Sequence, residues 1–168
     1  MLYGPDRGLV HERALRLIKT VVDDLNDPFR VVEIQGADLK SDPARLADEA
    51  KAIALGGGRR LVRIKNVSDI TTKIIAAYLK IAAPEDALII FESGELGPRS
   101  SLRKLFEKAK NAASIACYGD NPRNLPIVIN KILTDHGLKP TREAMAYLVN
   151  NLGSDRSITR GELEKLSL

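Results

Sequence analysis

The sequence has few of the residues that usually carry chemistry. It contains no tryptophan, one cysteine (Cys117) and two histidines (His11 and His136). A single cysteine excludes an intramolecular disulfide framework and suits a reducing compartment. No cysteine or histidine cluster has the spacing of metal ligands, and no serine lies in a nucleophile-elbow pattern. Cys117 lies in an apolar stretch, where it is expected to be a buried small hydrophobic residue. We therefore expect no catalytic residues, no metal and no cofactor.

Long apolar runs are also missing, and they would be needed to cross a membrane. Met1 is not followed by the basic and apolar segments of a signal peptide, so a soluble, cytoplasmic protein without membrane contact is expected. The net charge of +4 permits contact with nucleic acid or an acidic protein without requiring either. The sequence begins inside an apparent strand and ends inside a helical pattern, which predicts a piece of a longer chain.

The stretch from Leu2 to Arg13 has the pattern of a strand, a glycine-containing turn and the start of an amphipathic helix. P-loop proteins hold nucleotide phosphates at such a turn with the pattern Gly-x-x-x-x-Gly-Lys-Ser/Thr. Gly4 and Gly8 are one residue too close for that pattern, and Leu9 and Val10 replace the lysine and the hydroxyl residue. The sequence therefore predicts a degenerate P-loop that binds no nucleotide.

Strand and helix patterns alternate as far as Gly119, and only helix patterns follow. This alternation predicts right-handed β-α-β units and a parallel, three-layer α/β sheet of five strands. A boundary near Asp120 would separate an α/β domain (1–120) from a small three-helix domain (121–168). Beyond Leu2–Tyr3, strands are expected at Phe29–Ile34, Leu61–Ile64, Ala87–Phe91 and Ala113–Tyr118. Helices are expected from Leu9 to Leu25, from Asp42 through Ile53 with Asp42 as N-cap, from Ser68 as N-cap to Pro84, from Pro98 to Lys110, from Leu125 to Asp135, from Thr141 to Leu152, and from Ser157 onward.

A second nucleotide element would be a strand that ends in acidic residues able to hold Mg²⁺. The strand before Glu92 and Ser93 offers one glutamate and a serine, which is a poor hydrolytic site. His11, beside Glu12 and Arg13, is expected to be solvated. ATP hydrolysis is therefore not expected.

Two surface features remain as candidate contacts. The first is a basic cluster, whose simplest interpretation is a solvated helix surface and whose alternative is a DNA or partner contact. Its members are Arg99, Arg103, Lys104, Lys108 and Lys110. The second is the corner Ile53-Ala54-Leu55-Gly56, followed by two more glycines. Leu55 either covers the core at an ordinary helix end or is presented to the pocket of a partner.

Several segments taken together resemble the delta subunit of bacterial DNA polymerase III, most closely in alphaproteobacterial form. In this family, delta is the clamp-loader subunit that grips and opens the sliding clamp. The resemblance spans the chain in order and is carried by Leu2–Val10, Asp27–Val32, Ala54–Arg60, Pro98–Phe106 and Gly161–Leu166.

The resemblance implies an AAA+-like α/β domain followed by a helical lid, without the collar domain through which delta joins the other clamp-loader subunits. It implies no ATP binding or hydrolysis, and a place in the DNA polymerase III holoenzyme rather than catalysis of its own. Its partner would be the clamp (the beta subunit), with only weak or indirect DNA contact. In the family an adjacent Leu-Phe pair enters a clamp pocket. Leu55 matches the leucine, but Gly56 stands in place of the phenylalanine, so we expect weaker binding or compensation from Ile53, Arg59 and Arg60.

Two other functions stay open. One is an AAA+ ATPase or switch with an unorthodox P-loop. The other is a DNA-binding module that uses the basic cluster.

Overall fold

The computed structural model describes residues 1–54, 57–118, 125–152 and 156–166. Contacts between residues divide the chain into two compact units. The first comprises Met1–Gly4 and Val10–Ala116, and we call it the sheet unit. The second comprises Pro5–Leu9 and Cys117–Leu168, and we call it the helical unit. The assignment of residues 1–120 and 121–168 to two functional domains stays a prediction.

The sheet unit is built on five parallel strands in the order β2-β3-β4-β1-β5. The predicted five-stranded parallel sheet is therefore confirmed. The strands are short and rich in β-branched and apolar residues, as is typical of a sheet covered on both faces. They are β1 (Leu2–Tyr3), β2 (Val31–Gln35), β3 (Leu61–Lys65), β4 (Leu88–Ser93) and β5 (Ile115–Ala116).

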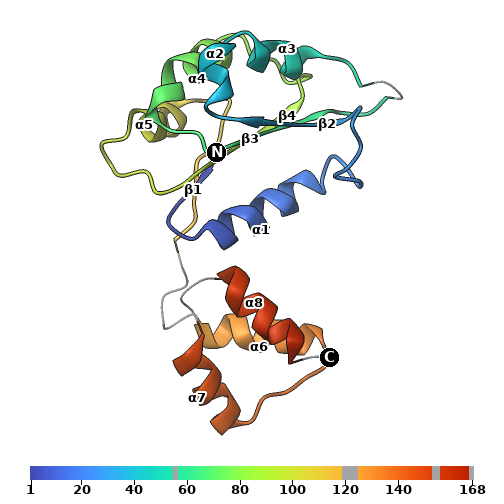
Figure 1. Cartoon of the computed structure of the whole chain (residues 1–168), viewed down its shortest axis with the longest axis vertical. Helices are drawn as coiled ribbons and strands as arrows, with labels where there is room; N and C mark the ends of the chain where they lie inside the picture. Colours follow the sequence, from blue (N-terminus) through green and yellow to red (C-terminus); the bar gives the residue numbers. More distant parts are fainter. Residues whose placement is uncertain (55–56, 119–124, 153–155, 167–168) are drawn as a thin grey trace. The chain divides into compact units, whose positions relative to one another are not determined.

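Helices cover both faces of this sheet (Figure 1). Helix α1 (Arg7–Ile18) lies on one face, and the short helices α2 to α5 lie on the other. The main core between the sheet and the second group includes Leu46, Ile75 and Leu102, all with fully buried side chains. The helices of this group are α2 (Asp38–Ser41), α3 (Arg45–Lys51), α4 (Thr72–Leu79), preceded by the 3₁₀ turn Asp69–Thr71, and α5 (Ser101–Lys108).

Two helices end earlier than the sequence pattern predicts. Helix α1 stops at Ile18 and not near Leu25, because the β-branched run Thr20-Val21-Val22 disfavours helix and the Val21 carbonyl accepts a hydrogen bond from Arg30 Nη2 (2.6 Å). Helix α3 stops at Lys51 and not beyond Ile53. There the Ala50 carbonyl accepts a bond from the Ala87 amide (2.8 Å), so it is tied to the start of β4.

The two predicted N-caps also differ from the structure. The Asp42 carboxylate accepts a bond from the Arg45 amide (3.2 Å) as expected, but a separate helix, α2, precedes it, and regular α3 begins only at Arg45. Ser68 makes no side-chain cap. Asp69 reaches across instead to the start of α5, where it accepts bonds from the Ser100 hydroxyl (2.6 Å) and the Leu102 amide (2.9 Å).

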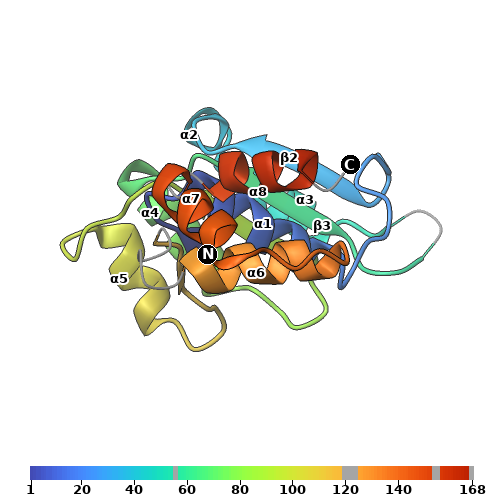
Figure 2. The same cartoon turned by 90° about the horizontal axis from the view of Figure 1, so that it is seen from below.

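The helical unit contains α6 (Leu125–Asp135), α7 (Arg142–Asn151) and α8 (Arg156–Lys165), shown from two sides in Figures 1 and 2. Helix α6 contacts both α7 and α8. Leu125, Ile129 and Leu133 recur along one face of α6 and pack with Leu163 of α8 in a small core. Thr141 caps α7 by accepting a bond from the Ala144 amide (3.2 Å). The three helices that the sequence predicts are therefore present, within one or two residues of the expected bounds.

Candidate functional site

The turn after β1 is a glycine turn bonded to the neighbouring strand. Gly4 has a φ of +153°, in a region essentially restricted to glycine, and its amide donates to the Gly94 carbonyl (3.1 Å). The turn is therefore bonded to the chain that leaves β4, the strand beside β1. Gly8 lies inside α1 and not in the turn.

A carboxylate of the chain itself caps the helix that follows this turn. Asp6 Oδ1 accepts a hydrogen bond from the Leu9 amide (2.8 Å). Free amides at such a helix start are what a bound phosphate requires, and here one of them is used by a negatively charged side chain that repels phosphate. The sequence reasoning missed Asp6, although an aspartate directly before the first residue of a helix is a recognisable N-cap signal.

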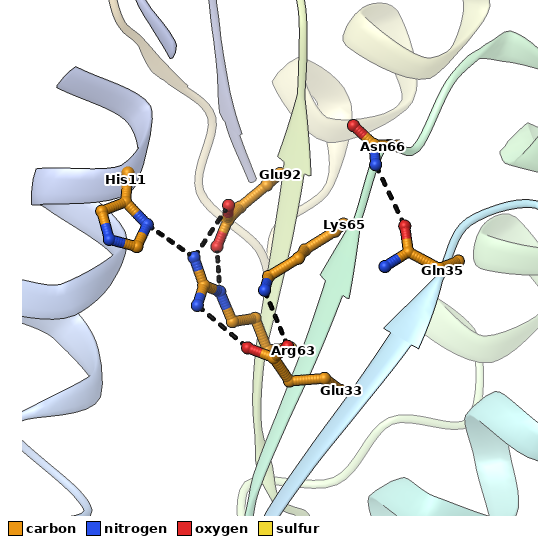
Figure 3. A network of polar contacts seen from close by, with 7 residues as sticks. All are labelled: His11, Glu33, Gln35, Arg63, Lys65, Asn66 and Glu92. Carbon is orange, nitrogen blue, oxygen red and sulfur yellow. Dashed lines mark hydrogen bonds and ion pairs between the residues drawn. The ribbon is translucent and has the colours of Figure 1, made fainter. Parts of the chain in front are cut away.

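Arg63 is the centre of a polar network on the α1 face of the sheet (Figure 3). Its guanidinium makes a two-point ion pair with Glu92 of β4, through Nε to Oε1 and Nη2 to Oε2. Its Nη1 donates to Glu33 of β2 (3.0 Å), and its Nη2 donates to His11 Nδ1 of α1 (2.9 Å). Lys65 donates to the other oxygen of Glu33 (2.7 Å). The network therefore joins three neighbouring strands to the helix that covers them.

The charges in this network balance. Burial acts to lower the pKa of Arg63, but the hydrogen bonds and charges of Glu92 and Glu33 outweigh it and raise that pKa above its usual value. Burial likewise acts to raise the pKa of Glu33, and Lys65 and Arg63 outweigh it, so the pKa of Glu33 is lowered. Both side chains therefore stay charged at neutral pH, and the Glu92 carboxylate already has a cation.

This arrangement bears on two residues singled out from the sequence. The sequence offers Glu92 as a poor Mg²⁺ ligand, and the structure places it beside the Arg63 guanidinium. His11 is exposed as expected, but it also contacts Arg63, which sequence reasoning missed. The missed signal was a pair of cations, Arg63 and Lys65, two residues apart in an otherwise apolar strand. Residues spaced by two share one face of a sheet.

The corner after α3 presents an exposed apolar side chain. Ile53 is 92% exposed, whereas its neighbour Ala54 is buried. The Ala54 carbonyl accepts a bond from the Gly57 amide (3.2 Å). Leu55 and Gly56, the other two predicted clamp-binding residues, lie outside the described residues.

The two arginines after this corner hold its base. Arg59 Nε donates to the Asp86 carbonyl (2.8 Å). Arg60 pairs with the Glu49 carboxylate of α3 (2.9 Å). Both guanidiniums are thus engaged within the sheet unit, whereas the Ile53 side chain is exposed.

The basic cluster does not act as one surface. Arg103 pairs with Glu107 (2.7 Å) and lies over the Tyr3 ring, 5.4 Å from its centre. Arg103 is therefore part of the packing of α5, whereas Arg99, Lys104, Lys108 and Lys110 are exposed. A DNA or partner contact by the exposed members stays a prediction.

Cys117 is buried. In the described parts of the chain, no group of three His, Cys, Asp or Glu side chains could hold a metal ion. Over the same residues, no helix is long and apolar enough to cross a membrane.

Comparison with known families assigns the chain to a replication family. The family model described as DNA polymerase III, delta subunit, matches residues 1–118. The chain belongs to this delta-subunit family. A probable DNA polymerase III subunit delta from Rickettsia prowazekii is 24% identical over 166 residues, covering 99% of this chain and 49% of the relative.

Solved structures show the same fold as this delta-family chain. The Bacillus subtilis DNA clamp loader delta protein matches with a TM-score of 0.71 and 23% identity, over 99% of this chain and 51% of that one. The replication initiator DnaA, bound to AMPPCP and single-stranded DNA, matches with a TM-score of 0.56 and 13% identity, over 99% of this chain and 54% of that one. The fold is thus AAA+-like, and the chain spans about half the length of its relatives.

Proposed function

We propose that this chain is the clamp-gripping half of a clamp-loader delta subunit, which binds and opens the sliding clamp during DNA replication. Membership of the delta family supports the role in replication. The main support for clamp binding at the corner is the exposure of Ile53, which is 92% exposed. Arg59 and Arg60, which follow the corner, are both bonded within the sheet unit. An exposed apolar side chain on a corner that hydrogen bonds fix in place is suited to enter a pocket of a partner.

The proposed activity uses no nucleotide of its own. Asp6 occupies a helix-start amide that a phosphate would need, and Arg63 compensates the Glu92 charge that a metal ion would otherwise balance. With Leu9 and Val10 in place of the lysine and hydroxyl residues, the turn lacks the groups that hold phosphates and Mg²⁺. The chain contributes no catalysis to the DNA polymerase III holoenzyme and works in the cytoplasm, where the DNA is replicated.

Opening of the clamp would follow from differential affinity. A partner that binds the open form of a ring better than the closed form shifts the ring toward the open form. The other clamp-loader subunits would control when the corner is available, through a collar domain that belongs to the rest of the delta subunit. This chain is therefore expected to bind the clamp by itself and to need that domain for loader assembly.

The corner differs from the family pair at Gly56. Burying a leucine contributes about 1.5–3 kcal/mol, and a missing phenylalanine forfeits a comparable amount. We propose that Leu55 enters the clamp pocket and that Ile53 supplies part of the apolar surface that Gly56 lacks.

Titration of the sliding clamp from the same organism into the purified chain tests the grip. Leu55→Asp is expected to abolish binding, and Ile53→Asp to weaken it at least tenfold, because either change places a charge in an apolar pocket. Ile70→Asp is the matched control, since Ile70 is an exposed isoleucine (72%) outside the corner. Unchanged clamp binding by Leu55→Asp would reject the corner as the grip.

The alternative is an AAA+ ATPase or switch. Equilibrium titration with a fluorescent ATP analogue separates the two functions. Micromolar, Mg²⁺-dependent binding would favour the ATPase, whereas the proposed function predicts no saturable binding.

A further inference from the structure

We propose that the loop between α1 and β2 is a second contact for the sliding clamp, with Phe29 as its anchor; this inference rests on the proposed clamp binding. Phe29 is 58% exposed and Leu25, in the same loop, is 38% exposed. Aromatic residues, phenylalanine among them, are enriched in protein interfaces. Phe29 lies outside the buried core clusters, so its ring is available to a partner.

Hydrogen bonds order the backbone around Phe29. Asp27 Oδ1 accepts a bond from the Phe29 amide (2.9 Å), and the Asp27 carbonyl accepts one from the Val31 amide (2.9 Å). Asp24 Oδ1 accepts a bond from the Asn26 amide (2.8 Å) in the same way. Because these turns already order the backbone, little conformational entropy remains to be lost when a partner binds.

Arg30 connects this loop to the base of the proposed clamp-binding corner. Its Nη2 donates to the Val21 carbonyl (2.6 Å) and to the Arg59 carbonyl (3.2 Å). The Arg30 carbonyl accepts a bond from the Leu61 amide at the start of β3 (2.8 Å). Both loops lie at the same end of the sheet, at the right in Figure 1. Arg30 therefore ties the loop that carries Phe29 to the chain that follows the corner.

The charge of the segment between Val21 and Phe29 favours a protein partner over DNA. Asp23 and Asp24 are exposed and Asp27 is half-buried, and no lysine or arginine lies between Val21 and Phe29. These carboxylates would repel a phosphate backbone. They suit a protein surface that has an apolar centre with basic or hydrogen-bond-donating groups around it.

The test compares clamp affinity of the unchanged chain with that of Phe29→Ala. The substitution is expected to weaken clamp binding at least tenfold while the thermal unfolding midpoint stays the same, since Phe29 is largely exposed. Leu25→Ala, a second variant in the same loop, is expected to weaken binding about threefold. Ile70→Ala, which removes a similarly exposed apolar side chain elsewhere, is expected to bind like the unchanged chain.

Three results would overturn the proposal. If Phe29→Ala and Leu25→Ala both bind the clamp normally while Ile53→Asp does not, the corner is the grip and the loop is no contact. If the unchanged chain fails to bind the clamp, the proposed function itself is wrong. If Phe29→Ala reduces self-association in analytical ultracentrifugation and leaves clamp affinity unchanged, the loop contacts a second copy of this chain.

Discussion

Replacing Arg63 by methionine tests whether the charge network stabilises the sheet unit. Methionine keeps an unbranched apolar stem and removes the guanidinium. The side chains of Arg63 and Glu92 are only 6% and 12% exposed, whereas Glu33 is 45% exposed. The variant therefore leaves Glu92 as a largely buried and uncompensated carboxylate, while Glu33 keeps both Lys65 and solvent.

The expected loss follows from this burial. Removing one partner of a buried ion pair destabilises a protein by about 3–5 kcal/mol, chiefly because the other charge stays buried. We expect the low end, about 3 kcal/mol, since one of the two acids stays solvated. The double variant Arg63→Met/Glu92→Gln removes the orphaned charge as well and should recover about half of the loss.

Urea unfolding followed by circular dichroism measures these free energies. Glu33→Gln is the control, with an expected loss below about 1 kcal/mol because Glu33 is half exposed. A loss below about 1 kcal/mol for Arg63→Met would contradict the reasoning. So would equal losses for the single and double variants, which would show that the buried charge of Glu92 carries no cost.

Three further predictions concern local contacts and pH. The pKa of Glu33 is lowered from 4.5, so the stability that its charge contributes is complete above that value and is lost as the pH falls through the folded pKa. In Glu33→Gln the unfolding free energy should therefore fall less between about pH 5 and pH 3 than in the unchanged chain. An equal fall in both proteins would contradict this. Asp6→Ala should cost about 1 kcal/mol in urea unfolding through loss of the cap, whereas Asp6→Asn should stay within a few tenths; equal losses would argue against capping. Tyr78 donates to the buried Asp86 carboxylate (2.9 Å), so Tyr78→Phe should cost about 1–2 kcal/mol, and a neutral substitution would show that the bond adds nothing.

Much of the fold could be predicted from periodicity. Leu125, Ile129 and Leu133 repeat at helical spacing and do pack in one core. Continuous apolar runs such as Ile89-Ile90-Phe91 form parallel strands. Element ends were less predictable because they depend on contacts far along the chain. Examples are the Arg30 bond to the Val21 carbonyl beyond the end of α1 and the Ala87 bond to the Ala50 carbonyl in α3.

The candidate site was only partly predictable. The missing lysine after Gly8 is visible in the sequence, because it is a single position in a local pattern. The polar network around Arg63 is not visible in this way, since it joins residues from β2, β3, β4 and α1 that are far apart in the chain. The exposure of Ile53 was not predictable either, because the sequence pattern continues the helix through Ile53 whereas α3 ends at Lys51.

Calorimetric titration of the sliding clamp into this chain, with and without Mg-ATP, tests the central claim most directly. The claim predicts saturable clamp binding with the same dissociation constant in both solutions. Binding that requires Mg-ATP, or no binding in either solution, would contradict it.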